Sequence, residues 1–430
     1  MMRFCMVTTF YPPYNFGGDG IFVRQLAMAL AGIGHEVRVI HCEDAFRLKS
    51  NAPDPGLPAR YEDNGVEVCR LKSLCGALSP LLTQQLGRPA LKASQLQRML
   101  DDGYDVINFH NISLVGGPAV LGYGRAPVKL YTLHEHWLVC ATHILWKNRS
   151  RRCDSRQCIR CSIRSGIPPQ LWRYTGLIPR ALDEVDVLIA SSRFTADQHL
   201  RLFPDAPMRI VPLFSRIRPA DDFLQRHSTS ERPLFVISGR ITVSKGVESV
   251  VEQFAQMRDY DLVLAGDGDA LPRLKQRYAD CPNISFAGQL DEEALVALYA
   301  RAYALIFPSL APETFGLTAV EAMACGTPAI VMDSGGCREI IETTGAGFVY
   351  RSPAELPELL HRVVNDQALR QQLSQLALAG YRKYYTRERY LDDYLAIVAG
   401  IRDQKLSGHR GTAAASRDNR DSHAENGLVT

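Results

Sequence analysis

Short apolar runs alternate with longer amphipathic stretches along most of the chain. Runs bounded by Gly, Pro, Asn or Asp are typical of strands buried on both faces, and the stretches between them favour helices. The alternation predicts an α/β protein with parallel sheets. The predicted strands are residues 3–8, 37–41, 66–71, 106–109, 128–133, 185–190 and 209–212, and then 234–238, 262–265, 283–286 and 304–307.

A polar, charged segment at residues 217–232 separates these two sets of strands and is typical of a linker. With 430 residues, the chain is long enough for two domains that each have a core. We therefore expect an N-terminal domain at 1–216, a C-terminal domain at 233–385, and a helix at 386–404 that packs back on the N-terminal domain. Residues 405–430 show no apolar periodicity, so we expect them to be disordered.

Composition excludes few classes of protein. The hydrophobic content of 46% is ordinary for a globular protein, and the formal net charge of +3 does not indicate a nucleic-acid partner. The N-terminus lacks the apolar core of a signal peptide, and no window approaches the roughly 20 apolar residues of a spanning helix. We expect a cytoplasmic protein, with peripheral contact at the inner face of the plasma membrane as a further expectation.

The loop after the predicted strand 304–307 opens at a strand's carboxyl end, where open α/β sheets bind ligands. A helix is predicted over residues 316–325. Its N-terminus would offer unpaired amides to an anionic group such as phosphate. These amides belong to Phe315, Gly316 and Leu317, and Gly316 has no side chain to hold the anion away.

Two glutamates flank this helix N-terminus. Glu313 lies in the loop, and Glu321 lies about two turns into the predicted helix. A carboxylate accepts hydrogen bonds from a pair of hydroxyls, the pattern that ribose and hexose both present. The alternative is that both glutamates are surface charges.

The stretch from Phe307 to Arg338 resembles the signature of retaining glycosyltransferases of family four. The resemblance rests on Pro-Ser before Glu313, Phe-Gly-Leu after it, Glu-Ala-Met-Ala-Cys-Gly-Thr-Pro at 321–328, and a Gly-Gly turn beyond. It implies the GT-B fold, in which two Rossmann-like, doubly wound domains face each other across a cleft. It also implies that Glu313 contacts the donor sugar and Glu321 the ribose of the nucleotide.

Arg240 and Lys245 follow the predicted strand 234–238. The segment fails the P-loop pattern, because no glycine precedes Lys245 and no Ser or Thr follows it. A guanidinium and an ammonium at a strand end can still neutralise a diphosphate. The resembled family uses a G-R-x4-K-G pattern in this way, which assigns both cations to the leaving nucleotide diphosphate. The alternative is a pair of surface cations.

The first loop is glycine-rich, but its glycines come too late for a dinucleotide-binding fingerprint. The family carries a similar loop, so Gly17 and Gly18 are expected to approach the donor. His110 and His134 stand at the ends of two strands and should face the same side of the sheet. By resemblance His134 touches the donor sugar near the reacting carbon, and a structural role stays open for both histidines.

An insertion at about 140–172 is rich in cysteine and arginine. Four thiolates can hold a structural zinc ion, although the spacing is not that of a standard finger. Reduced thiols packing a loop, or a redox pair, are the alternatives. The arginines favour an anionic acceptor or membrane headgroups, or form a solvated basic loop. The cysteines concerned are Cys140, Cys153, Cys158 and Cys161.

These observations and the resemblance predict a retaining hexosyltransferase. It would move a sugar from a nucleotide diphosphate sugar to a hydroxyl of a glycan or lipid-linked acceptor. The expected pathways are cell-surface polysaccharide, lipopolysaccharide or glycolipid synthesis. The chemistry requires no cofactor, because Arg240, Lys245 and the helix N-terminus stabilise the departing diphosphate. The alternatives are a nucleotide-sugar epimerase of the same fold and a zinc-stabilised, non-catalytic interaction protein.

Overall fold

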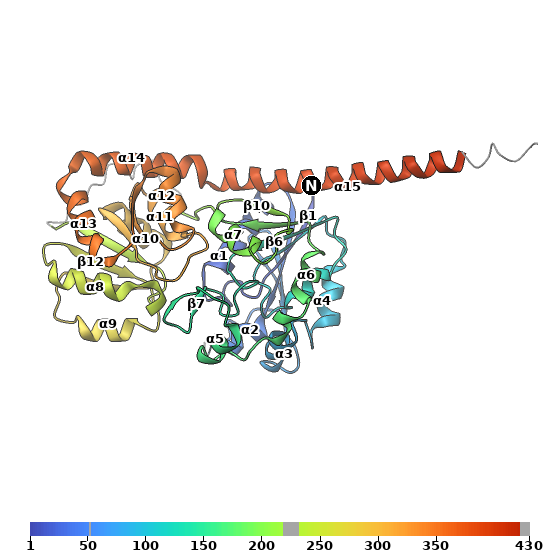
Figure 1. Ribbon diagram of the computed structural model, residues 1–430, viewed down its shortest axis with the longest axis horizontal. Coiled ribbons are helices and arrows are strands. Elements are labelled where there is room, and N and C mark those ends of the chain that lie inside the picture. The colour runs from blue at the N-terminus through green and yellow to red at the C-terminus, as the bar shows by residue number, and fades with distance from the viewer. Residues whose placement is uncertain (51–52, 218–231, 422–430) are drawn as a thin grey trace, which may run out of the picture.

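The computed structural model describes residues 1–50, 53–217 and 232–421, with side chains up to residue 407 (Figure 1). One sheet forms before residue 217 and a second after residue 232, as the two sets of apolar runs predicted. We expected a linker at 217–232. Only its end residues, 217 and 232, belong to the described part of the chain.

The N-terminal sheet has eight strands in the order β10-β9-β6-β5-β1-β2-β4-β3. Neighbouring strands are parallel, except that β3 pairs antiparallel with β4 at one edge. The central strands are buried on both faces, which explains their unbroken apolar runs. The strands are β1 (Arg3–Val7), β2 (Glu36–Cys42), β3 (Arg60–Asp63), β4 (Val66–Leu71), β5 (Val106–Phe109), β6 (Val128–Leu133), β9 (Val187–Ala190) and β10 (Met208–Ile210).

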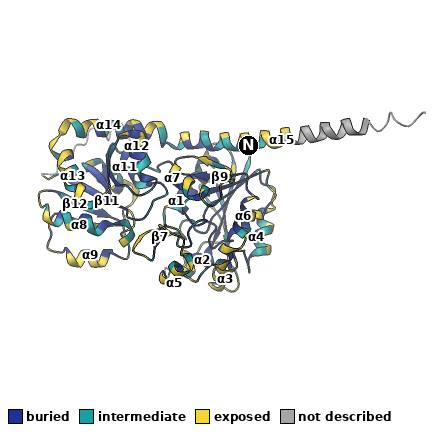
Figure 2. Ribbon diagram, viewed as in Figure 1, coloured by how far each residue is buried: buried dark blue, intermediate teal, exposed yellow. Residues whose placement is uncertain are grey.

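Helices cover both faces of this sheet, and their apolar sides complete two hydrophobic cores, one on each face (Figure 2). The sequence did not predict α2, α3 and β3. Both α2 and β3 are short, and two of the four buried residues of α2 are acidic, so its buried side shows no apolar pattern. The helices are α1 (Gly18–Gly32), α2 (Glu43–Lys49), α3 (Leu78–Leu86), α4 (Ala93–Leu100), α6 (Leu177–Leu182) and α7 (Arg193–Leu200), with the 3-10 turn η1 (Pro118–Gly122).

The insertion between β6 and α6 contains little regular structure. A two-stranded hairpin projects from it toward the C-terminal domain (Figure 1). A short helix and a 3-10 turn follow the hairpin. These elements are β7 (Trp146–Lys147), β8 (Arg151–Arg152), α5 (Cys158–Arg164) and η2 (Leu171–Tyr174).

The C-terminal sheet has six parallel strands in the order β13-β12-β11-β14-β15-β16. The chain winds outward in both directions from β11 and β14, so the switch point between these two neighbours is a natural ligand position. The strands are β11 (Leu234–Ser238), β12 (Asp261–Ala265), β13 (Ile284–Gly288), β14 (Ala304–Phe307), β15 (Ala329–Met332) and β16 (Gly347–Tyr350). The helices are α8 (Val247–Gln256), α9 (Leu271–Arg277), α10 (Glu292–Arg301), α11 (Leu317–Ala324), α12 (Cys337–Thr344) and α13 (Leu356–Asn365), with the turns η4 (Val243–Lys245) and η5 (Pro353–Glu355).

Two helices in tandem connect the domains at the top of Figure 1. α14 (Gln367–Tyr384) packs on α11, and α15 (Arg387–Asp421) crosses to α1 and β6 of the N-terminal domain. We expected a disordered tail from Lys405 onward. The structure instead continues α15 through residues 405–421. No proline interrupts this segment, and adding a residue to an existing helix is easier than starting a new one. Residues 422–430 lie outside the described residues.

Candidate active site

The N-terminus of α11 lies at the carboxyl end of β14 and has no side-chain cap. The first amides of a helix lack partners within it, and the aligned peptide dipoles place partial positive charge there. β14 is one of the two strands at the switch point of the sheet. This helix end can therefore accept an anionic group.

Glu313 and Lys245 meet beside this helix end. The Lys245 ammonium nitrogen lies 2.6 Å from Oε1 of Glu313, and the Ser309 hydroxyl donates to the same carboxylate oxygen. Lys245 ends the turn η4 after β11, while Glu313 belongs to the loop after β14. The two strands at the switch point thus each contribute one charged group. The side chains are 25% and 19% exposed, so both groups are accessible to a ligand.

Gly246 fixes the position of Lys245. Its φ of +66° is unfavourable for other residues, and an added Cβ would lie only 2.2 Å from the carbonyl oxygen of Pro308. The turn that carries Lys245 therefore packs directly on the Glu313 loop. The amides of Leu310 and Ala311 also donate to the carbonyl of Ser244, at 3.0 and 2.9 Å.

Arg240 follows β11 at the same edge of the sheet and is exposed. Its guanidinium forms no ion pair with another residue of the part of the chain described. A rigid, planar cation without a protein partner is available to a phosphate. The structure therefore brings Arg240, Lys245, Glu313 and the N-terminus of α11 to one edge.

Gly316 and Phe315 also have packing roles that the sequence did not indicate. The Cβ that Gly316 lacks would lie 2.9 Å from the Cβ of Cys337 on α12, so the glycine permits close packing of two helices. Its φ of +121° also requires glycine. The Phe315 side chain is buried against Tyr385. Only the backbone of these two residues is left to contact a ligand.

Glu321 lies on α11 but apart from the Glu313 pair. Its side chain is buried, and Oε1 lies 3.3 Å from Nε of Arg216, a residue that the sequence did not single out. Burial raises the pKa of Glu321 to about 7, although Arg216 acts in the opposite direction. Arg216 ends the N-terminal half just before the undescribed linker segment, where no motif marks it.

His110 and His134 meet at the carboxyl ends of β5 and β6, as their positions predicted. Nδ1 of His110 lies 2.9 Å from Nε2 of His134, and the rings are stacked. Burial lowers the pKa of both imidazoles, and each histidine is neutral at pH 7. Because one ring nitrogen of His134 is occupied by His110, its other nitrogen is the one that can contact a substrate.

Gly17 and Gly18 form the beginning of α1. Gly17 is the N-cap, and a side chain on Gly18 would meet nothing within 4 Å. The α1 residue Phe22 packs beside His134, with ring centroids 5.4 Å apart. The glycine loop and His134 therefore lie in the same part of the N-terminal domain.

Thr314 connects the Glu313 loop to the N-terminal domain. Its carbonyl oxygen accepts hydrogen bonds from the hydroxyls of Ser191, Ser192 and Thr195, at 3.1, 2.6 and 3.0 Å. Its own hydroxyl donates to the carbonyl of His134 at 3.1 Å. The residue after Glu313 thus contacts the residue predicted to touch the donor sugar.

Two further contacts join the domains on either side of Thr314. The carboxylate of Glu339, in α12, accepts bonds from the amides of Arg193 and Phe194 at the start of α7, at 2.8 and 2.6 Å. Arg152 of the β7–β8 hairpin donates to the carbonyls of Leu310 and Asp333. The structure is therefore a closed arrangement of the two domains.

Replacing Glu339 by alanine is expected to weaken this closed arrangement. Hydrogen bonds to a charged group contribute about 1.5–3 kcal/mol, so the ratio of closed to open molecules should fall by about tenfold or more. We expect a larger radius of gyration by small-angle X-ray scattering and a lower kcat/KM. Glu342→Ala is the matched control, because Glu342 lies on the same helix and bonds to Arg338 instead. Equal scattering curves for both variants would contradict the role.

The four cysteines of the insertion do not form the predicted zinc site. Among the described residues, no group of three or more ligating side chains is arranged to hold a metal ion. Their sulfurs have separate partners: Cys140 contacts the Thr142 hydroxyl, Cys153 donates to the Ser155 carbonyl, and Cys161 accepts from the Asn148 amide. The cysteine spacing was compatible with zinc, but the described residues show hydrogen-bonded thiols and no metal-binding group.

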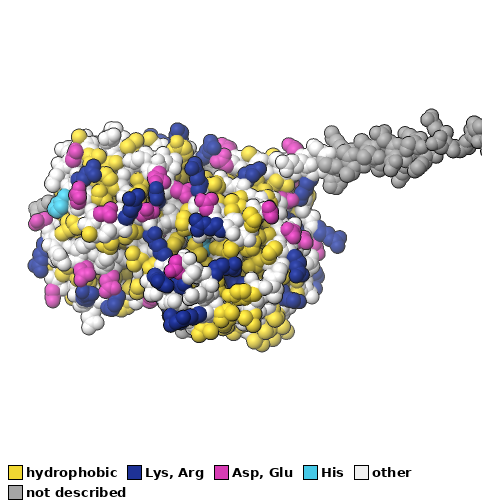
Figure 3. Space-filling model, viewed as in Figure 1, with side chains coloured by type: hydrophobic (Ala, Val, Ile, Leu, Met, Phe, Trp, Pro, Cys, Tyr) yellow, Lys and Arg dark blue, Asp and Glu magenta, His cyan; other side chains and the backbone are white. Residues whose placement is uncertain are grey.

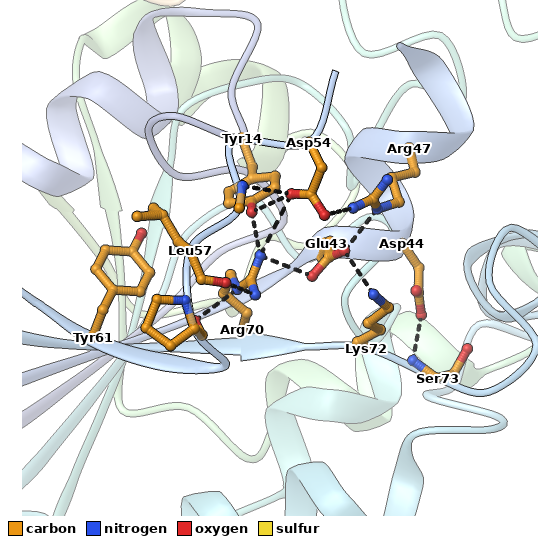
Figure 4. A network of polar contacts seen from close by, with 12 residues as sticks. Tyr14, Glu43, Asp44, Arg47, Asp54, Leu57, Tyr61, Arg70, Lys72 and Ser73 are labelled. Carbon is orange, nitrogen blue, oxygen red and sulfur yellow. Dashed lines mark hydrogen bonds and ion pairs between the residues drawn. The ribbon is translucent and has the colours of Figure 1, made fainter. Parts of the chain in front are cut away.

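A polar network links Tyr14 and Asp54 to β4 and α2 (Figure 4). The Tyr14 hydroxyl donates to Asp54 at 2.9 Å, and Arg70 forms an ion pair with the buried Glu43 at 3.2 Å. Arg47 bonds to both Glu43 and Asp54. The glycine loop that follows Tyr14 is thereby attached to β4 and α2.

Two family models match the chain. The model described as glycosyl transferase 4-like domain matches residues 17–213, and the model described as glycosyl transferases group 1 matches residues 221–378. Together they cover most of both sheets and most of the residues described above, including Arg240, Lys245 and Glu313. The chain belongs to the family-four-like glycosyltransferases.

Curated relatives agree with this assignment. An uncharacterized glycosyltransferase of Methanocaldococcus jannaschii is 26% identical over 416 residues, covering 89% of this chain and 94% of the relative. A glycogen synthase of Mycobacterium tuberculosis is 26% identical over 400 residues, covering 87% of this chain and 89% of the relative. This glycosyltransferase therefore matches such relatives over nearly their full length.

Solved structures confirm the predicted fold. Sucrose-phosphate synthase from Thermosynechococcus elongatus has a TM-score of 0.69 and 22% identity, covering 96% of this chain and all of that one. Anabaena Alr3699/HepE in complex with UDP and glucose has a TM-score of 0.61 and 17% identity, covering 95% of this chain and all of that one. The glycosyltransferase has the GT-B fold, with two Rossmann-like domains.

Proposed function

We propose that this glycosyltransferase moves a hexosyl group, with retention of anomeric configuration, from a nucleotide diphosphate sugar to a hydroxyl of a glycan or lipid-linked acceptor. The proposal places it in cell-surface polysaccharide or glycolipid synthesis at the cytoplasmic face of the membrane. One observation carries it. Lys245 and Glu313 meet at 2.6 Å beside the uncapped N-terminus of α11, at the switch point of the C-terminal sheet.

The site residues form two sets, one that binds the diphosphate of the donor and one that binds its hydroxyls. Arg240, Lys245 and the first amides of α11 bind the diphosphate and stabilise the charge that develops as it leaves. Glu313 and Glu321 accept hydrogen bonds from hydroxyls of the sugar and the ribose. A nucleotide sugar as the donor is supported by a structural neighbour, because the Anabaena structure holds UDP and glucose.

A diphosphate leaves as an anion, so the leaving group needs no protonation by a side chain. In the front-face reaction that we propose, the bond from the anomeric carbon to the diphosphate oxygen breaks and the bond to the acceptor oxygen forms on the same side. A phosphate oxygen takes the acceptor's proton. His134 is neutral, so its part is to bond a sugar hydroxyl rather than to supply charge.

Donor binding and transfer are tested in sequence. A thermal-shift screen of UDP-, GDP-, ADP- and dTDP-sugars should find at least one donor that raises the melting temperature, since a ligand bound to the native state stabilises it. With that donor, diphosphate release should depend on an added glycan acceptor, and NMR should show a retained anomeric configuration. Conversion of the donor without an acceptor would instead indicate an epimerase, and an inverted product would contradict retention.

A further inference from the structure

Exposed large hydrophobic side chains gather on one part of the N-terminal domain. Of the sixteen in the described chain, ten lie within residues 74–91 and 144–174. They include Leu81 of α3 and Ile163 of α5, and Ile163 is 62% exposed. Figure 3 shows this gathering at the lower edge of the domain, where Figure 1 labels α3 and α5. Single exposed apolar residues are ordinary, whereas a cluster indicates an interaction surface.

The two segments form one continuous surface. The indole nitrogen of Trp172, in η2, donates to the carbonyl of Gln84, in α3, at 2.8 Å. α3 and η2 also pack against each other. We call the exposed side chains of residues 74–91 and 144–174 the basic-apolar face.

The charged side chains on this face are basic, with Asp154 as the exception. Residues 71–100 contain no Asp or Glu, and Asp154 is the only acid in residues 136–182. On α5, Arg160 and Arg164 are four residues apart and lie on one side of the helix, next to the pair formed by Ile159 and Ile163. All four side chains are exposed. The helix therefore presents a basic row beside an apolar row.

A hollow of about 280 Å³ opens beside α5, and two arginines line it. Arg173 is held in place by stacking on Trp137 and Trp172, at 5.1 and 4.8 Å, and by a bond from Nη1 to the carbonyl of Leu138 at 3.1 Å. Its Nη2 is buried and has no hydrogen-bond partner in the described chain. The other arginine, Arg156, is exposed. A buried donor without a partner is unfavourable unless a ligand or water completes it, and here an anion would.

We propose that the basic-apolar face docks on an anionic lipid bilayer, with its leucines and isoleucines at the headgroup boundary and its arginines on lipid phosphates. Binding of a soluble anion would not explain why the leucines are exposed. Binding of an apolar protein partner would not explain the arginines. A bilayer with anionic lipids suits both. The inference deepens the proposed function, on which its link to a lipid-borne acceptor rests, but docking itself needs no catalysis.

Co-sedimentation of the full chain with vesicles tests the docking, with no donor or acceptor present. We expect at least tenfold tighter binding to vesicles of phosphatidylcholine mixed with phosphatidylglycerol than to phosphatidylcholine alone, and weaker binding as salt rises. The apolar variant Leu81→Glu/Ile163→Glu and the charge variant Arg160→Glu/Arg164→Glu should each lose at least tenfold in affinity. The controls Ile210→Glu and Arg258→Glu change exposed residues elsewhere and should bind as the wild type does.

Several results would overturn the docking proposal. These are no wild-type binding, equal binding to both kinds of vesicle, or full binding by both variants. Light scattering that shows a dimer broken by the apolar variant would instead make this face an interface between copies. The donor-induced thermal shift separates the two proposals, because both variants should keep it. Its absence from the wild type would contradict the proposed function and leave docking intact.

Discussion

Replacing Lys245 by methionine is expected to lower kcat/KM for transfer by roughly a thousandfold, the upper range for removing one preorganised electrostatic group. Methionine keeps much of the side chain's volume but cannot neutralise the departing diphosphate. The Lys245–Glu313 pair is partly exposed, so its loss should change the free energy of unfolding by less than about 1 kcal/mol. The expected variant is therefore folded and nearly inactive, as steady-state kinetics and thermal melting would show.

The matched control for this substitution is Lys275→Met, which removes an exposed lysine from α9 of the same domain. It should retain wild-type kinetics. Arg240→Met should resemble Lys245→Met in kcat/KM, because both cations are assigned to the same diphosphate. A Lys245→Met enzyme within tenfold of the wild type would contradict the assigned role and, with it, the proposed mechanism of diphosphate departure.

Replacing Glu321 by glutamine is expected to weaken donor binding by about a hundredfold while leaving the unliganded protein at least as stable at pH 8. In the proposed function the carboxylate accepts hydrogen bonds from two ribose hydroxyls, whereas an amide can accept only through its single oxygen. In the unliganded protein, however, burial raises the pKa of Glu321 from 4.5 to about 7. The buried charge therefore opposes folding above pH 7, by up to about 3 kcal/mol.

The sign of this effect gives a second readout for Glu321. The folded state binds the proton more tightly than the unfolded state, so the contribution of Glu321 to stability falls as pH rises from about 4.5 to about 7. Donor binding needs the ionised form, so donor affinity should rise over pH 6 to 8 in the wild type. The glutamine variant should show neither pH dependence. If the glutamine variant kept the pH dependence of the wild type, Glu321 would not be the group that causes it.

The sequence predicted those parts of the site that depend on strand order. Apolar runs located β11 and β14, and a polar residue after a buried parallel strand has little freedom in where it lies. Lys245 and Glu313 are 68 residues apart but meet, because the two strands are neighbours and each charged group follows its strand closely. The same argument placed His110 beside His134.

Features that depend on packing between distant segments were not predicted. The sequence indicated that Gly316 leaves room for phosphate, but not that a Cβ at this position would collide with Cys337 of α12. Arg216 carries no motif, and its importance comes only from its contact with buried Glu321. The cysteine spacing fitted zinc, but the described residues contain no metal-binding group, and the β7–β8 hairpin carries Arg152 to the other domain. None of these contacts leaves a periodic signal.

The chain passes between the domains at two places that are bonded to each other. The amide of Ser215, before the first passage, donates to the carbonyl of Tyr385, which lies in the second, at 3.2 Å. The Tyr381 hydroxyl donates to the Ile217 carbonyl at the same distance. The α14–α15 junction lies on the opposite side of the molecule from the β7–β8 hairpin (Figure 1). Rotation of one domain against the other would therefore pivot near Tyr385 and displace Arg152 more than the contacts at the pivot, which makes a spectroscopic label on the hairpin a sensitive reporter of substrate entry.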